Sequence, residues 1–516
     1  MKLTHLVALL LASAGPDPAT AAATDVAPGD DFSRFTNGDW ERATAIPDGY
    51  NAWGARAQLR QDNLEKMAAL YQEAARGGPG ISAAAHRVGL YNAAQMDLAT
   101  IERKGLAPVR AMLDEIAALR DKTALAAYLG ARLRVDVDPV NFGAFASENP
   151  FGLWVGPGLK NPARHLPYLL QGGLSLGGPE TYLASDAEQQ AVIAQLRRYI
   201  GELLGAAHVT DAEARAGRIA DLETRIARTH ASTAASGDLA KAAPLWRRAD
   251  FKTRAPGLDW DAYFDAAWPA CAPADRRLAA GRDQGHRRAG RCGSAAGLAG
   301  LSAVSRAQHE RPLSAQGVLG PLLRVLRSDL HWPVAAPAVL GSRGHADQHR
   351  HAGAQASCSP NAISRPRQKQ RGRHGARDRR RLRCPHRHAR LAVMPAARKQ
   401  ARVKLNAMVI GIGHPDAWRS SEGLDVRADD AFGNVQRVQA FNYRHELAKI
   451  GQPVDRKEWI LGAELFGINQ MPLQNALTIP MTDLQPPFFD ADGPDAANYG
   501  AVGTRIRASS ASGSTR

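Results

Sequence analysis

The sequence predicts a mostly α-helical protein. Three observations carry this prediction: apolar side chains recur at helical spacing, Ser or Thr stands three residues before Glu at two points where such spacing begins, and glycine-rich turns follow. Consecutive amphipathic helices joined by short turns pack into helical domains. With 516 residues and 44% hydrophobic side chains, the chain is long enough for two or more domains with substantial cores.

The first clear helix is predicted to end at Gly77-Gly78-Pro79, a sequence that stops helices. Upstream of this turn, apolar side chains fall on one helical face: Leu59, Leu64, Met67, Tyr71 and Ala74. Two later helices are predicted from capping boxes, in which Ser or Thr pairs with a Glu three residues on: Ser185 with Glu188, and Thr210 with Glu213. We expect residues 27–268 to form one helical domain.

Residues 269–400 break this pattern. Between residues 271 and 400 there are 26 Lys and Arg against 6 Asp and Glu, so this segment alone accounts for the formal charge of +16 of the whole chain. It holds all four cysteines and nine of the 16 histidines, but Trp332 is its single aromatic residue. A segment so poor in aromatic side chains has little from which to build a core, so we expect it to be disordered and to form no disulfide framework.

Helical patterning returns after residue 400, and residues 401–464 are expected to complete the helical domain. Asn434 to Ile450 is predicted as a helix that ends at Gly451. Residues 465–503 are expected to begin a second domain, through an apolar run that ends at Pro480. The tail 504–516 is rich in Arg, Ser, Ala and Gly without any period, like the basic segment.

The amino terminus has the features of a secretory signal peptide over residues 1–23. Lys2 supplies the positive charge, Leu3 to Leu11 form a short apolar run, and Ala19 to Ala23 offer small residues for cleavage. The apolar run is too short to span a bilayer as a helix. We therefore expect a secreted or periplasmic protein without a permanent membrane anchor.

Several motifs fit one known family, and they lie within about 27–268 and 401–503. They are Asp30–Trp40, Gly89-Leu90-Tyr91, Lys104–Pro108, Gln171–Leu176, Leu222–Ala227, Ile412–Arg419, Leu484–Asp490 and Asn498–Gly503. In these motifs the sequence resembles the neprilysin and endothelin-converting-enzyme family of zinc metalloendopeptidases, especially its bacterial secreted members. The resemblance implies a helical cap domain, only the beginning of a thermolysin-like catalytic domain, and a cavity that admits peptide substrates.

The chemistry of that family requires a zinc ion held by two His four residues apart on a helix, with a Glu beside the first His as base and a later Glu as third ligand. The resemblance places this helix just after Gly503, but residues 504–516 contain no His, Glu or Asp. The family's substrate-binding Asn-Ala pair aligns with Gly467-Ile468. We therefore assign no catalytic, cofactor-binding or metal-binding residue, and expect this chain to bind no zinc specifically.

Two interpretations follow from the resemblance. The first is a chain that descends from a secreted, peptide-cleaving zinc metalloendopeptidase and has itself lost the activity. In this interpretation, residues 271–400 and 504–516 are translated out of frame with the rest of the gene. The alternative is a non-catalytic peptide-binding or interaction protein that retains the cap domain.

Other polar groups mimic functional sites. His445-Glu446 resembles the start of the zinc motif, but its fifth position is Lys449, a cation where a ligand is needed, so we expect a solvated helix face. His309-Glu310 also fails, because its fifth position is Leu313. Structural caps or ion pairs are expected for three acidic residues in the family motifs or beside them: Asp97, Glu223 and Asp416. For Asn475 we expect a structural role rather than a ligand role.

The basic segment contains two further groups with ligand chemistry. These are His345, His349 and His351, and Cys384, His386 and His388. We expect no metal site there, because the groups follow the overall bias of the segment and lack the paired half-sites of zinc proteins. The arginines between 371 and 383 have no aromatic residues among them to stack on bases, so we expect no specific nucleic-acid partner.

Overall fold

The structure is a computed structural model of the chain. It describes residues 26–268, 294–296 and 395–514, apart from residues 51, 141–146, 148, 233–234, 236–244 and 464. The predicted signal peptide lies outside the described residues, and so does the basic segment except for 294–296 and 395–400.

The amino-terminal part is a succession of helices whose starts are capped by side chains. The first six are α1 (Phe32–Ala43), α2 (Ala55–Arg76), α3 (Ala83–Met96), α4 (Leu98–Lys104), α5 (Ala107–Ala117) and α6 (Lys122–Ala131). Asp31, Ser82, Asp97 and Asp121 each accept a hydrogen bond from the backbone N–H three residues on. The predicted stop of α2 is confirmed, because Gly77 follows it with a positive φ of 66°.

Five shorter or later helices follow: α7 (Pro179–Leu183), α8 (Ala187–Ala206), α9 (Ala212–Thr229), α12 (Asp250–Arg254) and α13 (Trp260–Ala267). Both predicted capping boxes are wrong in detail. The cap of α8 is Asp186, whose side chain accepts from the N–H of Gln189. The residue before α9 is Asp211, which adopts a left-handed conformation and makes no side-chain cap. In both cases an Asp next in sequence takes the position given to Ser185 or Thr210.

A four-stranded sheet, absent from the sequence-based prediction, lies among these helices. Its order is β1 (Phe151–Pro157), β2 (His165–Gln171), β4 (Ser294–Ala296) and β3 (Leu245–Arg247), and β1 and β2 are antiparallel. Residues of β1 and β2 are buried almost throughout, so they lack the alternation of polar and apolar residues that marks a half-exposed strand. Their side chains pack with Phe251, Trp260 and Tyr263 in the largest buried cluster.

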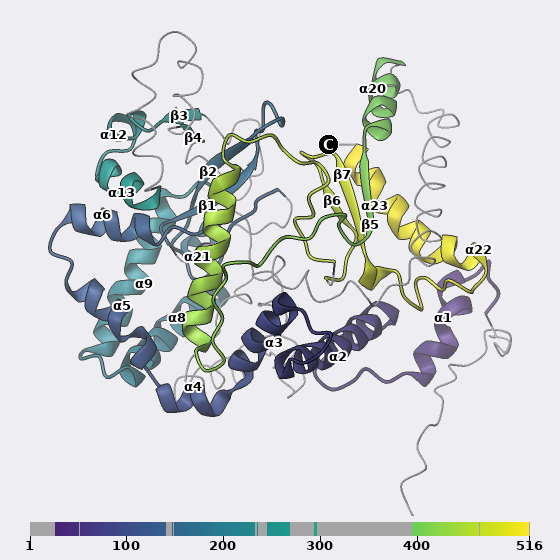
Figure 1. Cartoon of the computed structure of the whole chain (residues 1–516), viewed down its shortest axis with the longest axis horizontal. Coiled ribbons are helices and arrows are strands. Elements are labelled where there is room, and N and C mark those ends of the chain that lie inside the picture. The colour runs from purple at the N-terminus through teal and green to yellow at the C-terminus, as the bar shows by residue number, and fades with distance from the viewer. Residues whose placement is uncertain are drawn as a thin grey trace, which may run out of the picture.

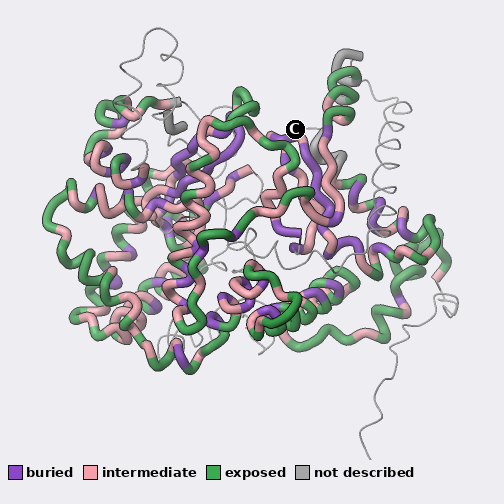
Figure 2. The backbone as a smooth tube through the Cα atoms, viewed as in Figure 1, coloured by how far each residue is buried: buried purple, intermediate pink, exposed green. Residues whose placement is uncertain are grey.

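The carboxy-terminal part is built around a second, three-stranded sheet. Its elements are α20 (Pro395–Asn406), β5 (Val409–Gly413), α21 (Ala431–Lys449), β6 (Asn469–Met471), β7 (Ala476–Pro480), η3 (Met481–Asp483), α22 (Asp495–Asn498), η4 (Tyr499–Gly503) and α23 (Thr504–Ser514). The strand order is β5-β7-β6, with β5 parallel and β6 antiparallel to β7. Figure 1 shows α23 running beside this sheet, and buried positions follow both sheets in Figure 2.

Helix α21 joins the two parts. The prediction of this helix is confirmed, although it begins at Ala431 and is capped by Asp430. Its last turns pack against the cluster of the first sheet, and the hydroxyl of Tyr443 donates to the carbonyl oxygen of Ala267 at 2.8 Å. Near its start, Gln95 donates to the carbonyl oxygen of Ala431. Among the described helices, none is both long and apolar enough to cross a membrane.

Candidate functional site

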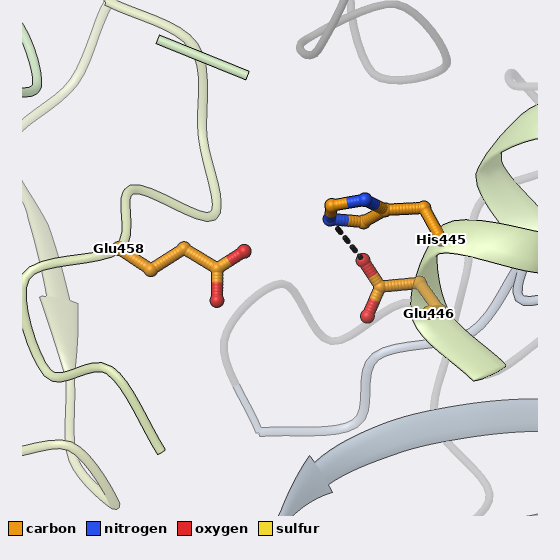
Figure 3. Close-up of side chains that lie close together, drawn as sticks. All are labelled: His445, Glu446 and Glu458. Carbon is orange, nitrogen blue, oxygen red and sulfur yellow. Dashed lines mark ion pairs between the residues drawn. The ribbon is translucent and has the colours of Figure 1, made fainter. Parts of the chain in front are cut away.

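One group of side chains with metal-ligand chemistry is found in the part of the chain that the structure describes. His445 and Glu446 extend from the last turns of α21 toward Glu458, which comes from the loop after the helix (Figure 3). Each offers one ligand atom, and these atoms lie within 4.8 Å of one another. His445 Nε2 is 3.9 Å from Glu446 Oε1. By residue type alone, an imidazole and two carboxylates could hold a divalent cation.

Lys449 already supplies a cation to this group. Its ammonium donates to Oε1 of Glu446 at 2.8 Å and to Oε1 of Glu458 at 2.5 Å. Burial alone would lower the pKa of Lys449, but the two facing carboxylates outweigh burial and raise that pKa. The lysine is therefore charged at neutral pH and neutralises the carboxylates that a metal would need.

This arrangement does not fit a zinc ion. A metal between the same carboxylates would meet a fixed positive charge within hydrogen-bond distance of its ligands. Burial lowers the pKa of His445 to about 4, with Arg419 and Lys449 acting in the same direction. The side chains thus form a charge-balanced cluster of their own, in which Lys449 pairs with both carboxylates.

The expectation of a solvated helix face at His445-Glu446 is wrong. The side chains of Glu446 and Lys449 are only 18% and 20% exposed. Burial raises the pKa of Glu446, and Lys449 opposes that shift. The sequence pattern could not show this burial, because it depends on Glu458, nine residues beyond Lys449, folding back over the helix end.

The helix that follows Gly503 stands where the family resemblance places the zinc-binding helix. Helix α23 presents Thr504, Arg505 and Ile506 in its first turn, and Ile506 is buried with Leu477 and Ile479 of β7. None of the first residues of α23 offers an imidazole or a carboxylate. The residues present therefore do not fit a zinc ion.

Arg505 instead fixes α23 to the sheet. Its Nη2 lies 2.5 Å from Oδ1 of Asp483, a carboxylate that is completely buried. The second oxygen of Asp483 accepts from the N–H of Gly467 at 2.7 Å. The guanidinium also lies over the rings of Phe466 and Phe488, 5.0 and 4.6 Å from their centroids. Burial raises the pKa of Asp483, and Arg505 counters this and favours its charged form.

The caps or ion pairs expected in the family motifs are confirmed for Asp97 and Asp416, whereas Glu223 acts as a hydrogen-bond acceptor. Asp97 caps α4, and Glu223 accepts from Ser175 and from the hydroxyl of Tyr182. Asp416 makes an exposed ion pair with Lys457 at 3.7 Å. The amide of Asn475 donates to the carbonyl oxygen of Lys404 at 2.8 Å.

The His and Cys groups of the basic segment lie outside the described residues. This holds for His309-Glu310, for the groups around His349 and His386, and for the arginines between 371 and 383. Their predicted lack of function therefore stays a prediction.

The chain has recognisable relatives in sequence and in fold. Residues 28–279 match the family model Peptidase family M13. Endothelin-converting enzyme-like 1 of Mus musculus is 25% identical over 519 residues, which cover 93% of this chain and 63% of that protein. Neprilysin of Mus musculus is 33% identical over 117 residues, or 21% of this chain and 16% of that protein.

Solved structures of zinc metalloproteases and related proteins have a fold similar to that of this chain. Zinc metalloprotease Zmp1 of Mycobacterium tuberculosis in its open state matches with a TM-score of 0.74 at 24% identity, over 95% of this chain and 74% of that one. PepO from Lactobacillus rhamnosis matches with a TM-score of 0.68 at 17% identity, over 93% and 75%. The chain spans 63% of the length of the endothelin-converting relatives. Over residues 28–279 it belongs to peptidase family M13, the family of neprilysin and the endothelin-converting enzymes.

Proposed function

We propose that this chain descends from an exported zinc metalloendopeptidase that acts on peptides, and that its described residues no longer form a zinc centre. In this proposal, residues 27–268 and 401–464 form the cap domain that encloses a peptide, and residues 465–503 begin the catalytic domain. Support for the first half comes from the family membership. Support for the second half comes from the first turn of α23, where Arg505 pairs with Asp483 and no side chain could bind zinc.

The decisive experiment is an assay of the full chain with a library of quenched fluorescent peptides. The proposal expects no turnover that depends on zinc and no stoichiometric zinc in the purified protein. Turnover that is lost with a chelator and restored with Zn²⁺ would show that the chain assembles a zinc centre after all. The matched control is a family member with an intact His-Glu-x-x-His motif, assayed with the same library.

Peptide binding without cleavage is the second candidate function, and one observation favours it. Side chains link the proposed cap to the start of the proposed catalytic domain: Lys66 of α2 donates to Oε1 of Gln485 at 3.2 Å, and Nε2 of Gln485 donates to Oδ1 of Asn63 at 2.9 Å. Binding of labelled peptides that survives chelator would support this function, whereas no binding to any member of the library would exclude it.

Export is proposed from residues 1–23, which lie outside the described residues. The proposal expects a mature protein in the periplasm or culture medium that begins shortly after Ala23. Mass spectrometry of the protein's amino terminus, in cells expressing the full gene, tests it.

A further inference from the structure

The turn after α21 is bound to the start of β2 through the main chain. We call the two segments, residues 163–165 and 450–454, the joint. Hydrogen bonds across it run from Gly451 N–H to His165 O (2.9 Å), from His165 N–H to Gln452 O (3.0 Å) and from Val454 N–H to Ala163 O (3.0 Å). Arg164 adds a side-chain bond to Gly451 O at 2.6 Å. The joint therefore attaches the carboxy-terminal part to the first sheet.

Six ionisable side chains lie at this joint, and we call them the joint cluster. They are His165, Arg419, His445, Glu446, Lys449 and Glu458. Two of these side chains are positive and two are negative at neutral pH, so the cluster is balanced only while both imidazoles are neutral.

Both imidazoles are placed where an added proton is unfavourable. His165 is 5% exposed, and its Nδ1 is buried without a hydrogen-bond partner among the described residues. Burial lowers its pKa, Lys449 lowers it further, and Glu458 opposes these effects. His445 faces Arg419 and Lys449 as cations, with Glu458 opposing them and Glu446 beside it on the same helix.

We propose that the joint is an acid-sensitive latch, which is closed at neutral pH and opens in mild acid when His165 and His445 accept protons beside Lys449 and Arg419. The direction follows from linkage. A histidine with a lowered pKa in the closed state binds its proton more readily once the joint opens, so lowering the pH through its ordinary pKa favours opening. Glu446 acts in the opposite direction: burial raises its pKa in the closed joint, so a proton on this carboxyl favours the closed state and offsets part of the effect of the histidines.

Opening at the joint would reach the second sheet through the loop that carries Glu458. In this loop, Arg456 donates to the carbonyl oxygens of Gln474 and Asn475, next to β7, at 2.7 and 3.2 Å. The ring of Trp459 lies directly against Gly411 of β5, so closely that a Cβ there would be 2.6 Å from the indole nitrogen. A latch that releases Glu458 therefore loosens the support of β5 and β7.

Amide hydrogen exchange of the full chain at about pH 7.5 and about pH 5 tests the latch, with rates corrected for intrinsic exchange. A histidine whose pKa drops from 6.5 to about 4 shifts an opening equilibrium about 30-fold over this range. Allowing for the partial exposure of His445, we expect protection of Gly451 and Val454 to fall about tenfold more than that of amides in α9.

Variants separate the latch from general acid instability. Replacing both imidazoles, His165→Gln with His445→Gln, should keep the joint amides protected at the lower pH. His230→Gln is the matched control, because burial also lowers the pKa of His230 but it lies outside the joint cluster. The proposal is overturned if the joint amides lose no more protection than α9 in the native chain. It is equally overturned if the double variant, folded by its circular dichroism, opens in acid as the native chain does.

Discussion

The end of α21 and the start of α23 are two places where a metal could have been expected, and in both a basic side chain stands in for the cation. At α21, Lys449 balances two carboxylates that remain partly exposed. At α23, Arg505 faces one carboxylate, that of Asp483, which is completely buried. The difference teaches that burial of the anion, more than the number of anions, should set how strongly each pair supports the fold.

The largest expected effect comes from Arg505→Ala, which leaves Asp483 buried without its counter-charge. We expect the free energy of unfolding to fall by about 3 kcal/mol at neutral pH, as for other broken buried pairs. Because burial raises the pKa of Asp483, the carboxyl of the variant takes up a proton as pH falls, so the loss should shrink toward acid pH. Urea unfolding followed by circular dichroism measures both values.

The control for this comparison is Arg507→Ala, an exposed position two residues along α23. It should change the free energy of unfolding by less than about 0.5 kcal/mol. Equal effects of the two variants would show that the pair with Asp483 does not hold the helix in place.

A smaller effect is expected for Lys449→Met, which leaves Glu446 and Glu458 without their cation. Because both carboxylates keep some contact with water, we expect a loss of about 2 kcal/mol at neutral pH. The same urea titration measures it. A loss larger than that of Arg505→Ala would reverse the ranking by burial.

Zinc binding distinguishes the two places chemically. Lys449→Gln removes the charge that opposes a metal, so His445, Glu446 and Glu458 should take up one additional Zn²⁺ relative to the native chain. Arg505→Ala should take up none, because Asp483 stands alone. Isothermal titration calorimetry measures the difference, and adding Glu458→Gln to Lys449→Gln should abolish it. Equal zinc uptake by the native chain and Lys449→Gln would contradict the role given to the lysine.

The smallest effect is expected at the exposed pair of Lys457 and Asp416, whose side chains are 71% and 86% exposed. Lys457→Ala should change the free energy of unfolding by less than about 0.5 kcal/mol, since water screens this pair. A loss comparable to that of Lys449→Met, again by urea unfolding, would show that exposure does not rank these pairs.

The sequence predicted what local patterns determine and missed what distant contacts determine. Helix α21 and the end of α2 follow from periodicity and from Gly77 and Gly451, which act on their immediate neighbours. Strands β1 and β2 were missed because full burial removes the alternation that identifies a strand. The charge-balanced cluster at α21 was missed because Glu458 belongs to another segment.

The structural role of the tail, residues 504–516, also depends on distant contacts that the sequence does not reveal. Residues 504–516 show no hydrophobic periodicity. Even so, Ile506 is buried with β7, and Arg505 forms an ion pair with Asp483. A lone arginine carries no signal of a partner 22 residues earlier. Only the three-dimensional arrangement of Phe466, Phe488 and the buried carboxylate gives it a role.

The joint also bears on the order in which the molecule folds. Arg164 and Gly451 are 287 residues apart in sequence, so their contact closes a very long loop. During synthesis, the side of the first cluster that Tyr443, Leu447 and Ile450 later cover is complete long before α21 emerges from the ribosome. That apolar surface stays uncovered until its last helix is made, which leaves the nascent chain prone to aggregation.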